Sequence, residues 1–237
     1  MSDILVVIPI YNEKIRIGPL LHRIRSLNLE GVDYLFVDDC SNDGTETILE
    51  HTEFNLVRHE NNLGCGLSVR TGLEYGREKN YPCVVVMAGN GKDDPFFIPN
   101  LAGPVLEGHA DIVQGSRYLA GGMRKSMPLH RRIGTRGYSF IASILLRKWI
   151  SDATNGFRAV STDILKKDEI NLRQSWFKSY EVESYLLSKA ILLGYRVIER
   201  PVSKNYPEDA DYSKMSAFSG WWSHFRPILF LSLGLKR

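Results

Sequence analysis

The chain has 237 residues, a hydrophobic content of 43% and a formal net charge of +3. This length fits one large α/β domain, with or without a small appendage, and the apolar content is sufficient for a core without disulfides. The charge is too small to indicate a nucleic-acid partner, so we expect none. The three cysteines show neither a disulfide framework nor zinc-ligand spacing, which favours a reducing, cytoplasmic compartment.

The first half of the chain alternates strand and helix patterns. Residues Ile4–Ile8 are continuously apolar, which is typical of a parallel strand covered on both faces. Further strands are predicted at 34–37, 54–58, 82–87 and 110–114, and helices at 14–27, 45–51, 67–79 and from Pro95 onward. These repeated units predict an α/β fold with a mainly parallel sheet and helices on both faces.

The second half is less regular. A basic, partly apolar helix is expected over 129–149, another helix over 180–193, a strand over 195–202 and a polar loop over 203–214. No run of about 18 apolar residues occurs, so we expect no membrane span. Aromatic, aliphatic and basic residues mix over 219–237, a pattern that fits an interfacial membrane anchor and equally fits packing against the core or a second copy of the chain.

Polar clusters follow three of the predicted strands, at residues 9–13, 38–39 and 88–94. Because ligands of open α/β sheets bind beyond the carboxyl ends of the strands, we expect these clusters to form one site. Neither a GxGxxG fingerprint nor a Walker A loop is present. Asp39 is the candidate acceptor for a base N–H, Tyr11 a candidate to stack on the base, and Glu13 a candidate acceptor for ribose hydroxyls.

Several motifs occur in an order that resembles family 2 glycosyltransferases, most closely the dolichol- or polyprenol-phosphate mannose synthase branch. They are IPIYNE (8–13), VDDCSNDGT (37–45), NNLGCGLSVRTGL (61–73), GSRYLAGG (115–122) and DATNGFRA (152–159). The resemblance implies a Rossmann-like GT-A domain over 1–215, followed by a C-terminal amphipathic extension over 216–237. It also implies a hexosyltransferase that inverts the configuration of the sugar.

The same resemblance assigns donor-binding residues. It implies donor contacts from Pro9, Tyr11, Glu13, Asp39, Gly64, Asn90 and Lys214. Cys65 stands between two glycines where the family often has lysine, so a basic donor contact is missing there.

The metal motif departs from that of the family. Where relatives resemble MDADGQHDP, this chain reads MAGNGKDDP over 87–95, so that Ala88 and Asn90 replace two aspartates and Lys92 replaces glutamine. Mg²⁺ and Mn²⁺ need oxygen ligands, whereas Lys92 would repel them. We therefore predict that Lys92 stabilises the leaving diphosphate without a metal. A metal shifted to Asp93 or Asp94, or a non-catalytic nucleotide-binding scaffold, stay open as alternatives.

Arginines on the acceptor side indicate a phosphate. Arg132 and Arg136 share a helix face at i,i+4 spacing, where like charges repel unless an anion lies between them. The resemblance implies that Arg117, Arg132 and Arg136 bind the acceptor phosphate, and Arg117 is also counted as catalytic. A phosphate is already anionic near pH 7, whereas a sugar hydroxyl needs a base, for which Asp152 is the candidate.

The sequence thus predicts transfer from a nucleoside diphosphate sugar to a polyprenyl phosphate, in cell-envelope assembly. A saccharide hydroxyl as acceptor is the alternative. We expect the protein to act peripherally at the inner face of the membrane, and a homo-oligomer is left open.

Overall fold

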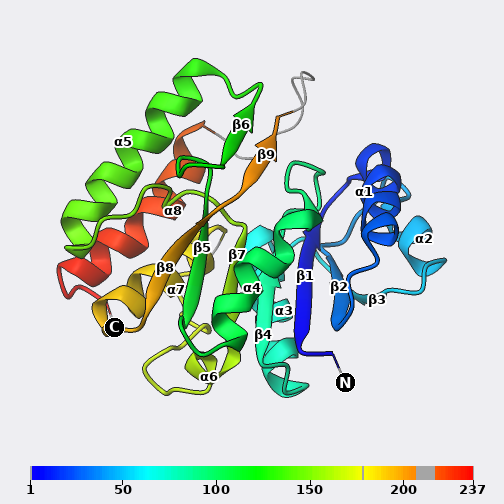
Figure 1. Cartoon of the computed structure of the whole chain (residues 1–237), viewed down its shortest axis with the longest axis horizontal. Coiled ribbons are helices and arrows are strands. Elements are labelled where there is room, and N and C mark those ends of the chain that lie inside the picture. The colour runs from blue at the N-terminus through cyan, green and yellow to red at the C-terminus, as the bar shows by residue number, and fades with distance from the viewer. Residues whose placement is uncertain (1, 178, 207–216, 237) are drawn as a thin grey trace.

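The computed structural model describes residues 2–177, 179–206 and 217–236. Its centre is a seven-stranded sheet in the order β3-β2-β1-β4-β7-β5-β8, with a separate two-stranded pair, β6-β9 (Figure 1). The strands of the sheet are β1 (Ile4–Ile10), β2 (Val32–Asp38), β3 (Asn55–Arg58), β4 (Cys83–Val86), β5 (Ile112–Ser116), β7 (Arg158–Ser161) and β8 (Val197–Pro201). The small pair consists of β6 (Met123–Lys125) and β9 (Ser203–Asn205).

The sheet is mainly parallel. β1 lies parallel to β2 and β4, β2 to β3, and β5 to β8, which confirms the predicted architecture. β7, which the sequence did not predict, is antiparallel to both β4 and β5. The predicted loop over 203–214 is wrong at its start, because β9 pairs there with β6.

Helices cover both faces of the sheet. They are α1 (Lys14–Leu27), α2 (Thr45–Glu50), α3 (Cys65–Glu78), α4 (Ile98–Leu106), α5 (Leu129–Leu146), α6 (Thr162–Leu165), α7 (Glu181–Leu192) and α8 (Ala217–Ser232), with a short 3-10 helix, η1, at Pro95–Phe97. Along β1, Val6 and Ile8 pack toward α1 and α4, while Leu5 and Val7 pack toward α3 and α7. This alternation explains the unbroken apolar run, since side chains of successive residues enter opposite layers.

Helix α8 belongs to the packed body of the protein. Ile228 and Leu231 are buried in the same core cluster as Tyr138 of α5 and Tyr185 of α7. Trp221 adds an aromatic contact with Tyr138, at 5.9 Å between ring centroids. Figure 1 shows α8 lying between α5 and the sheet. The sequence left open a membrane anchor, packing against the core and packing against a second copy of the chain. In the described residues of α8, the structure shows packing against the core.

Candidate functional site

One cavity of about 660 Å³ opens at the carboxyl ends of β1, β2 and β4. The three polar clusters expected to meet there do so. The predicted residues that line the cavity are Pro9, Tyr11, Glu13, Asp39, Gly64, Asn90, Lys92 and Arg117. Lys214, the remaining predicted donor contact, lies outside the described residues. The loops after β1 and β2 are tied together, because the Glu13 backbone N–H donates to the Thr45 hydroxyl at 2.9 Å.

Three glycines let the walls of the cavity approach one another. Gly64, just before α3, has φ of 92°, a left-handed conformation that side chains rarely adopt. A Cβ on Gly66 would lie 1.9 Å from the carbonyl oxygen of Ser179, so glycine allows α3 to contact the segment before α7. A Cβ on Gly89 would lie 2.9 Å from the carbonyl oxygen of Pro9. Glycine is therefore required at 66 and 89 by backbone proximity.

Asp39 is a fixed carboxylate in the lining of the cavity. Its Oδ1 accepts hydrogen bonds from His59 and from the Leu63 N–H, and its Oδ2 accepts one from the Gly64 N–H at 2.7 Å. Burial alone would raise the pKa of Asp39, but these hydrogen bonds outweigh it and lower the pKa. A carboxylate offers about four acceptor positions, so Oδ2 retains one for a further donor.

Basic side chains also line the cavity, among them Lys92, Arg131 and Lys204. Burial lowers the pKa of Lys92 to about 7, and the positive charges of Lys204 and Arg131 add to this effect, while Asp93 and Glu13 oppose it. The residue Lys92 as a whole is only 6% exposed to solvent. Such a cluster of buried like charges favours a bound anion.

The two aspartates proposed as shifted metal ligands have other partners. Asp93 forms an ion pair with Lys204 at 3.0 Å, and its other oxygen accepts the Ala88 N–H. Asp94 caps η1 by accepting the Phe96 N–H and pairs with Arg23 at 3.1 Å. Across the described ranges, no three His, Cys, Asp or Glu side chains are grouped so that they could hold a metal ion. Both aspartates are therefore already engaged by a basic side chain, Asp93 by Lys204 and Asp94 by Arg23.

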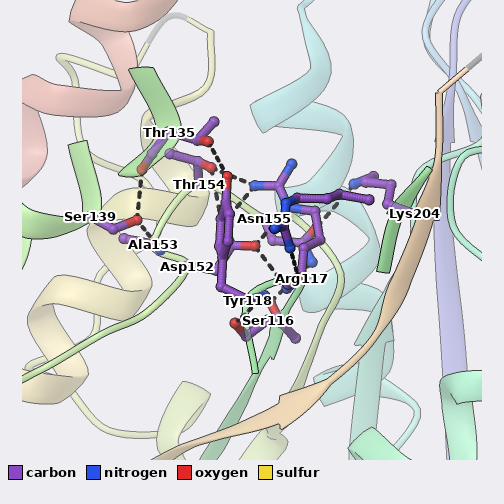
Figure 2. A network of polar contacts seen from close by, with 12 residues as sticks. Ser116, Arg117, Tyr118, Thr135, Ser139, Asp152, Ala153, Thr154, Asn155 and Lys204 are labelled. Atoms are coloured by element: carbon purple, nitrogen blue, oxygen red, sulfur yellow. Dashed lines mark hydrogen bonds and ion pairs between the residues drawn. The ribbon is translucent and has the colours of Figure 1, made fainter. Parts of the chain in front are cut away.

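Arg117 is held in a dense polar network (Figure 2). Its Nε and Nη2 donate to the two carboxylate oxygens of Asp152, both at 2.6 Å, and it also donates to Tyr206 and Thr154. Burial would lower the pKa of Arg117, but the Asp152 carboxylate outweighs it and raises the pKa. The guanidinium therefore stays charged and rigidly placed at the cavity wall.

Asp152 does not occupy the place of a general base. It is 0% exposed, both of its oxygens accept hydrogen bonds from Arg117, and it is absent from the described residues that line the cavity. A base must reach the proton that it removes, and this carboxylate instead positions the guanidinium. The structure thus gives Asp152 a supporting role that the sequence did not predict.

The basic cluster on α5 divides between two faces of the helix. Arg131 lines the cavity, with its guanidinium 5.5 Å from the ring centroid of Tyr206. Arg132 and Arg136 are exposed and, within the described part of the chain, lie outside the cavity lining. Of these three arginines, the structure thus brings Arg131 to the cavity, whereas the predicted pair lies on the exposed face of α5. The i,i+4 spacing identified a shared face and did not identify which face points inward.

The carboxylate of Glu183 also lines the cavity. Glu183 of α7 lies 3.9 Å from Arg158 of β7, measured between Oε1 and Nη2. A Cβ on Gly156 would lie 2.7 Å from the same Oε1, so glycine leaves room for the carboxylate. Burial and the nearby Arg158 lower the pKa of His224 on α8 to about 4, and His224 stacks on Tyr180 at 5.1 Å. Both rings line the cavity.

Sequence reasoning did not place α8 or Lys204 at the site. From α8, the cavity wall receives Gly220, Trp222, Ser223, His224 and Arg226. The mixed aromatic and basic pattern of this segment was the available signal, and it fits a membrane anchor and packing against the core equally well. Lys204 had no signal, because a lysine in a polar segment has no feature that marks it as buried.

A family model agrees with these motifs. The model described as "Glycosyl transferase family 2" matches residues 5–168, more than half of the chain. The chain belongs to this family. A family 2 relative, the UDP-N-acetylglucosamine–dolichyl-phosphate N-acetylglucosaminyltransferase of Methanococcus voltae, is 28% identical over 99% of this chain and 98% of its own length. The undecaprenyl-phosphate mannosyltransferase of Micrococcus luteus is 30% identical over 84% of this chain and 82% of its own length.

Solved structures share the fold of this glycosyl transferase. Glucosyl-3-phosphoglycerate synthase from Mycobacterium tuberculosis superposes with a TM-score of 0.69, at 19% identity, over 96% of this chain and 78% of that chain. That structure is a complex with Mn²⁺, uridine diphosphate and phosphoglyceric acid. At this identity the likeness establishes the GT-A fold, as predicted.

Proposed function

We propose that the protein transfers a sugar from a nucleoside diphosphate sugar to a polyprenyl phosphate. The observation that carries this proposal is one cavity lined both by the Asp39 carboxylate and by the cations Lys92, Arg131 and Lys204. This lining suits a ligand that has N–H and hydroxyl donors together with a diphosphate. The names of the two relatives given above describe sugar transfer to dolichyl phosphate and to undecaprenyl phosphate.

The donor lies with its base at Asp39 and its diphosphate at Lys92 in this proposal. The remaining acceptor position on Asp39 Oδ2 takes a base N–H, and Glu13 accepts from the ribose. Tyr11 and Pro9 line the space between them. Glu183, which lines the cavity beside Gly156 and pairs with the buried Arg158, is then a group that faces the sugar.

Lysines take the place of the family's metal in this proposal. The leaving nucleoside diphosphate gains negative charge as its bond to the sugar breaks, and that charge must be stabilised. Lys92 and Arg131 line the cavity, and Lys204 is paired with Asp93, one of the two aspartates that would have been the shifted metal ligands. We infer that transfer proceeds without Mg²⁺ or Mn²⁺.

A phosphate acceptor needs no base. Its second pKa of about 6 leaves it anionic at neutral pH, so positioning and charge suffice. An acceptor phosphate oxygen attacks the anomeric carbon while the bond from that carbon to the diphosphate oxygen breaks, and the diphosphate leaves with the electron pair. This single displacement inverts the anomeric centre. The buried position of Asp152 favours this acceptor over a sugar hydroxyl. With a lipid acceptor, we infer that the protein acts peripherally at the inner face of a membrane.

The test is turnover with radiolabelled donors. Purified protein is incubated with a panel of nucleoside diphosphate sugars and a polyprenyl phosphate, with excess EDTA or with Mn²⁺. We expect label in the organic phase with one donor, at equal rates in both conditions. Lys92→Met should lower the rate by about 100-fold or more, a loss typical of a transition-state charge contact, whereas Lys167→Met at an exposed position should not.

Each other outcome contradicts a stated part of the proposal. Product confined to the aqueous phase with a saccharide present would show a hydroxyl acceptor. Nucleotide binding without turnover for any donor would show a scaffold. Activity that EDTA abolishes and Mn²⁺ restores would show that the cations of the cavity do not replace a metal.

A further inference from the structure

The outward face of α5 is apolar. Leu129, Ile133, Phe140, Ile141 and Ile144 are between 46% and 68% exposed, and Ile133, Phe140 and Ile144 recur at helical spacing. The opposite face of the helix packs inward through side chains such as Tyr138 and Ala142. Figure 1 shows α5 at the edge of the molecule, with α8 on its inner side. Clustered apolar side chains of this kind mark a surface that contacts another body.

The charges around this face select its partner. Residues 112–151 contain no aspartate or glutamate. Arg132 and Arg136 are exposed near the start of α5, and Arg147 and Lys148 are exposed at its end. Trp149, directly after them, is 72% exposed, and tryptophan is enriched where lipid headgroups meet acyl chains. An apolar stripe bordered by bases and a tryptophan is the pattern of a helix that lies in a membrane interface.

We propose that the outward face of α5, defined by Ile133, Phe140 and Ile144 with the flanking Arg132 and Arg136, docks on a bilayer that contains anionic lipids. Anionic headgroups attract the bases, while the apolar stripe enters the interface. A second copy of the chain fits less well, because pairing this face with itself would bring the arginines of both copies together.

Docking through α5 has a consequence for the site, and this step rests on the proposed function. The same helix that carries Ile133 outward carries Arg131 into the cavity wall. Trp222 of the adjacent α8 is half exposed and also lines the cavity. A bilayer against α5 would therefore lie one helix away from the cavity wall formed by Arg131, where a polyprenyl phosphate from the bilayer would present its phosphate.

The test measures sedimentation with vesicles, without any sugar donor or acceptor. We expect the full chain to sediment with vesicles of 70% POPC and 30% POPG, and to be released from them by 500 mM NaCl. The variant Ile133→Ser/Phe140→Ser/Ile144→Ser should bind about tenfold or more weakly, since three interfacial side chains are lost. Its matched control is Leu192→Ser/Leu193→Ser, which changes exposed apolar residues at the end of α7 and should bind like the wild type.

Two results would overturn the proposal. One is equal sedimentation of the triple variant and the wild type, with circular dichroism showing both folded. The other is a wild-type dimer in analytical ultracentrifugation that the triple variant converts to a monomer. Turnover with a short-chain, water-soluble polyprenyl phosphate separates this proposal from the proposed function: the triple variant should retain it, and loss of vesicle binding with retained turnover concerns α5 alone.

Discussion

The titration of Lys92 should make the affinity for the donor depend on pH. Burial, then Lys204 and Arg131, lower its pKa to about 7, and Asp93 and Glu13 oppose the shift. A bound diphosphate favours the charged amine. Below pH 7 the amine is already protonated and affinity is complete, while above pH 7 binding must take up a proton and affinity falls, by up to about tenfold per pH unit.

Calorimetric titration with UDP and GDP across pH 6–9 measures this effect. Lys92→Arg is the matched variant, because a guanidinium stays charged throughout, and its affinity should vary little with pH. The His59–Asp39 contact is the same in both proteins, so its titration cancels in the comparison. Identical pH profiles for the wild type and Lys92→Arg would show that Lys92 is not responsible.

Replacing Gly66 should destabilise the protein, because neighbouring backbone lies too close to leave room for a side chain. An alanine Cβ would lie 1.9 Å from the Ser179 carbonyl oxygen, so backbone must move. We expect Gly66→Ala to lower the free energy of unfolding by about 1–3 kcal/mol and to weaken nucleotide binding, because the cavity wall shifts. Gly18→Ala in α1, where nothing lies within 4 Å, should be neutral or stabilise by about 0.5–1 kcal/mol. Urea denaturation compares the two, and equal effects would contradict the argument.

At the scale of the element, α8 is held to α7 by one charged contact. Arg226 donates to the Glu181 carboxylate at 2.5 Å and to the Trp176 carbonyl, and its guanidinium lies 5.6 Å from the Trp176 ring centroid. The Glu181 side chain is almost fully buried. Since α8 supplies one wall of the cavity, this contact links the C-terminal helix to the site.

Arg226→Ala should therefore destabilise the protein strongly. Removing the guanidinium breaks the ion pair of a buried carboxylate, which costs about 3–5 kcal/mol. The matched control is Arg173→Ala, which breaks a surface pair with Glu74 and should cost less than about 1 kcal/mol. Urea denaturation measures both. A second variant, Arg226→Met with Glu181→Gln, should recover part of the loss, and failure to recover would show that packing of the long side chain dominates.

At the scale of the whole molecule, the sequence predicted the parallel core and the strand-end site. Continuous apolar runs such as Ile4–Ile8 identified strands covered on both faces, and the topology then brought Glu13, Asp39 and Lys92 to one cavity. β7 escaped prediction because it has four residues, begins with Arg158 and pairs antiparallel with strands distant in the sequence. Length and periodicity carry little signal for such a strand.

The sequence also did not predict which face of α5 points toward the cavity. Arg131 and Arg132 are adjacent, and only the packing of side chains such as Tyr138 and Ala142 decides which arginine faces the cavity. The burial of α8 is a similar case, because an apolar and basic helix suits lipid and protein surfaces alike. Asp152 was misread for a related reason: its partner, Arg117, lies 35 residues away along the chain.

The position of β7 between β4 and β5 also affects how the chain folds during synthesis. During synthesis from the N-terminus, β4 is complete more than seventy residues before its neighbour Arg158–Ser161 emerges. Until then the nascent chain presents an unpaired, fully apolar strand edge, the kind of surface that recruits other chains. The two parallel parts of the sheet, β3-β2-β1-β4 and β5-β8, are thus joined by a strand that is synthesised after β4 and β5.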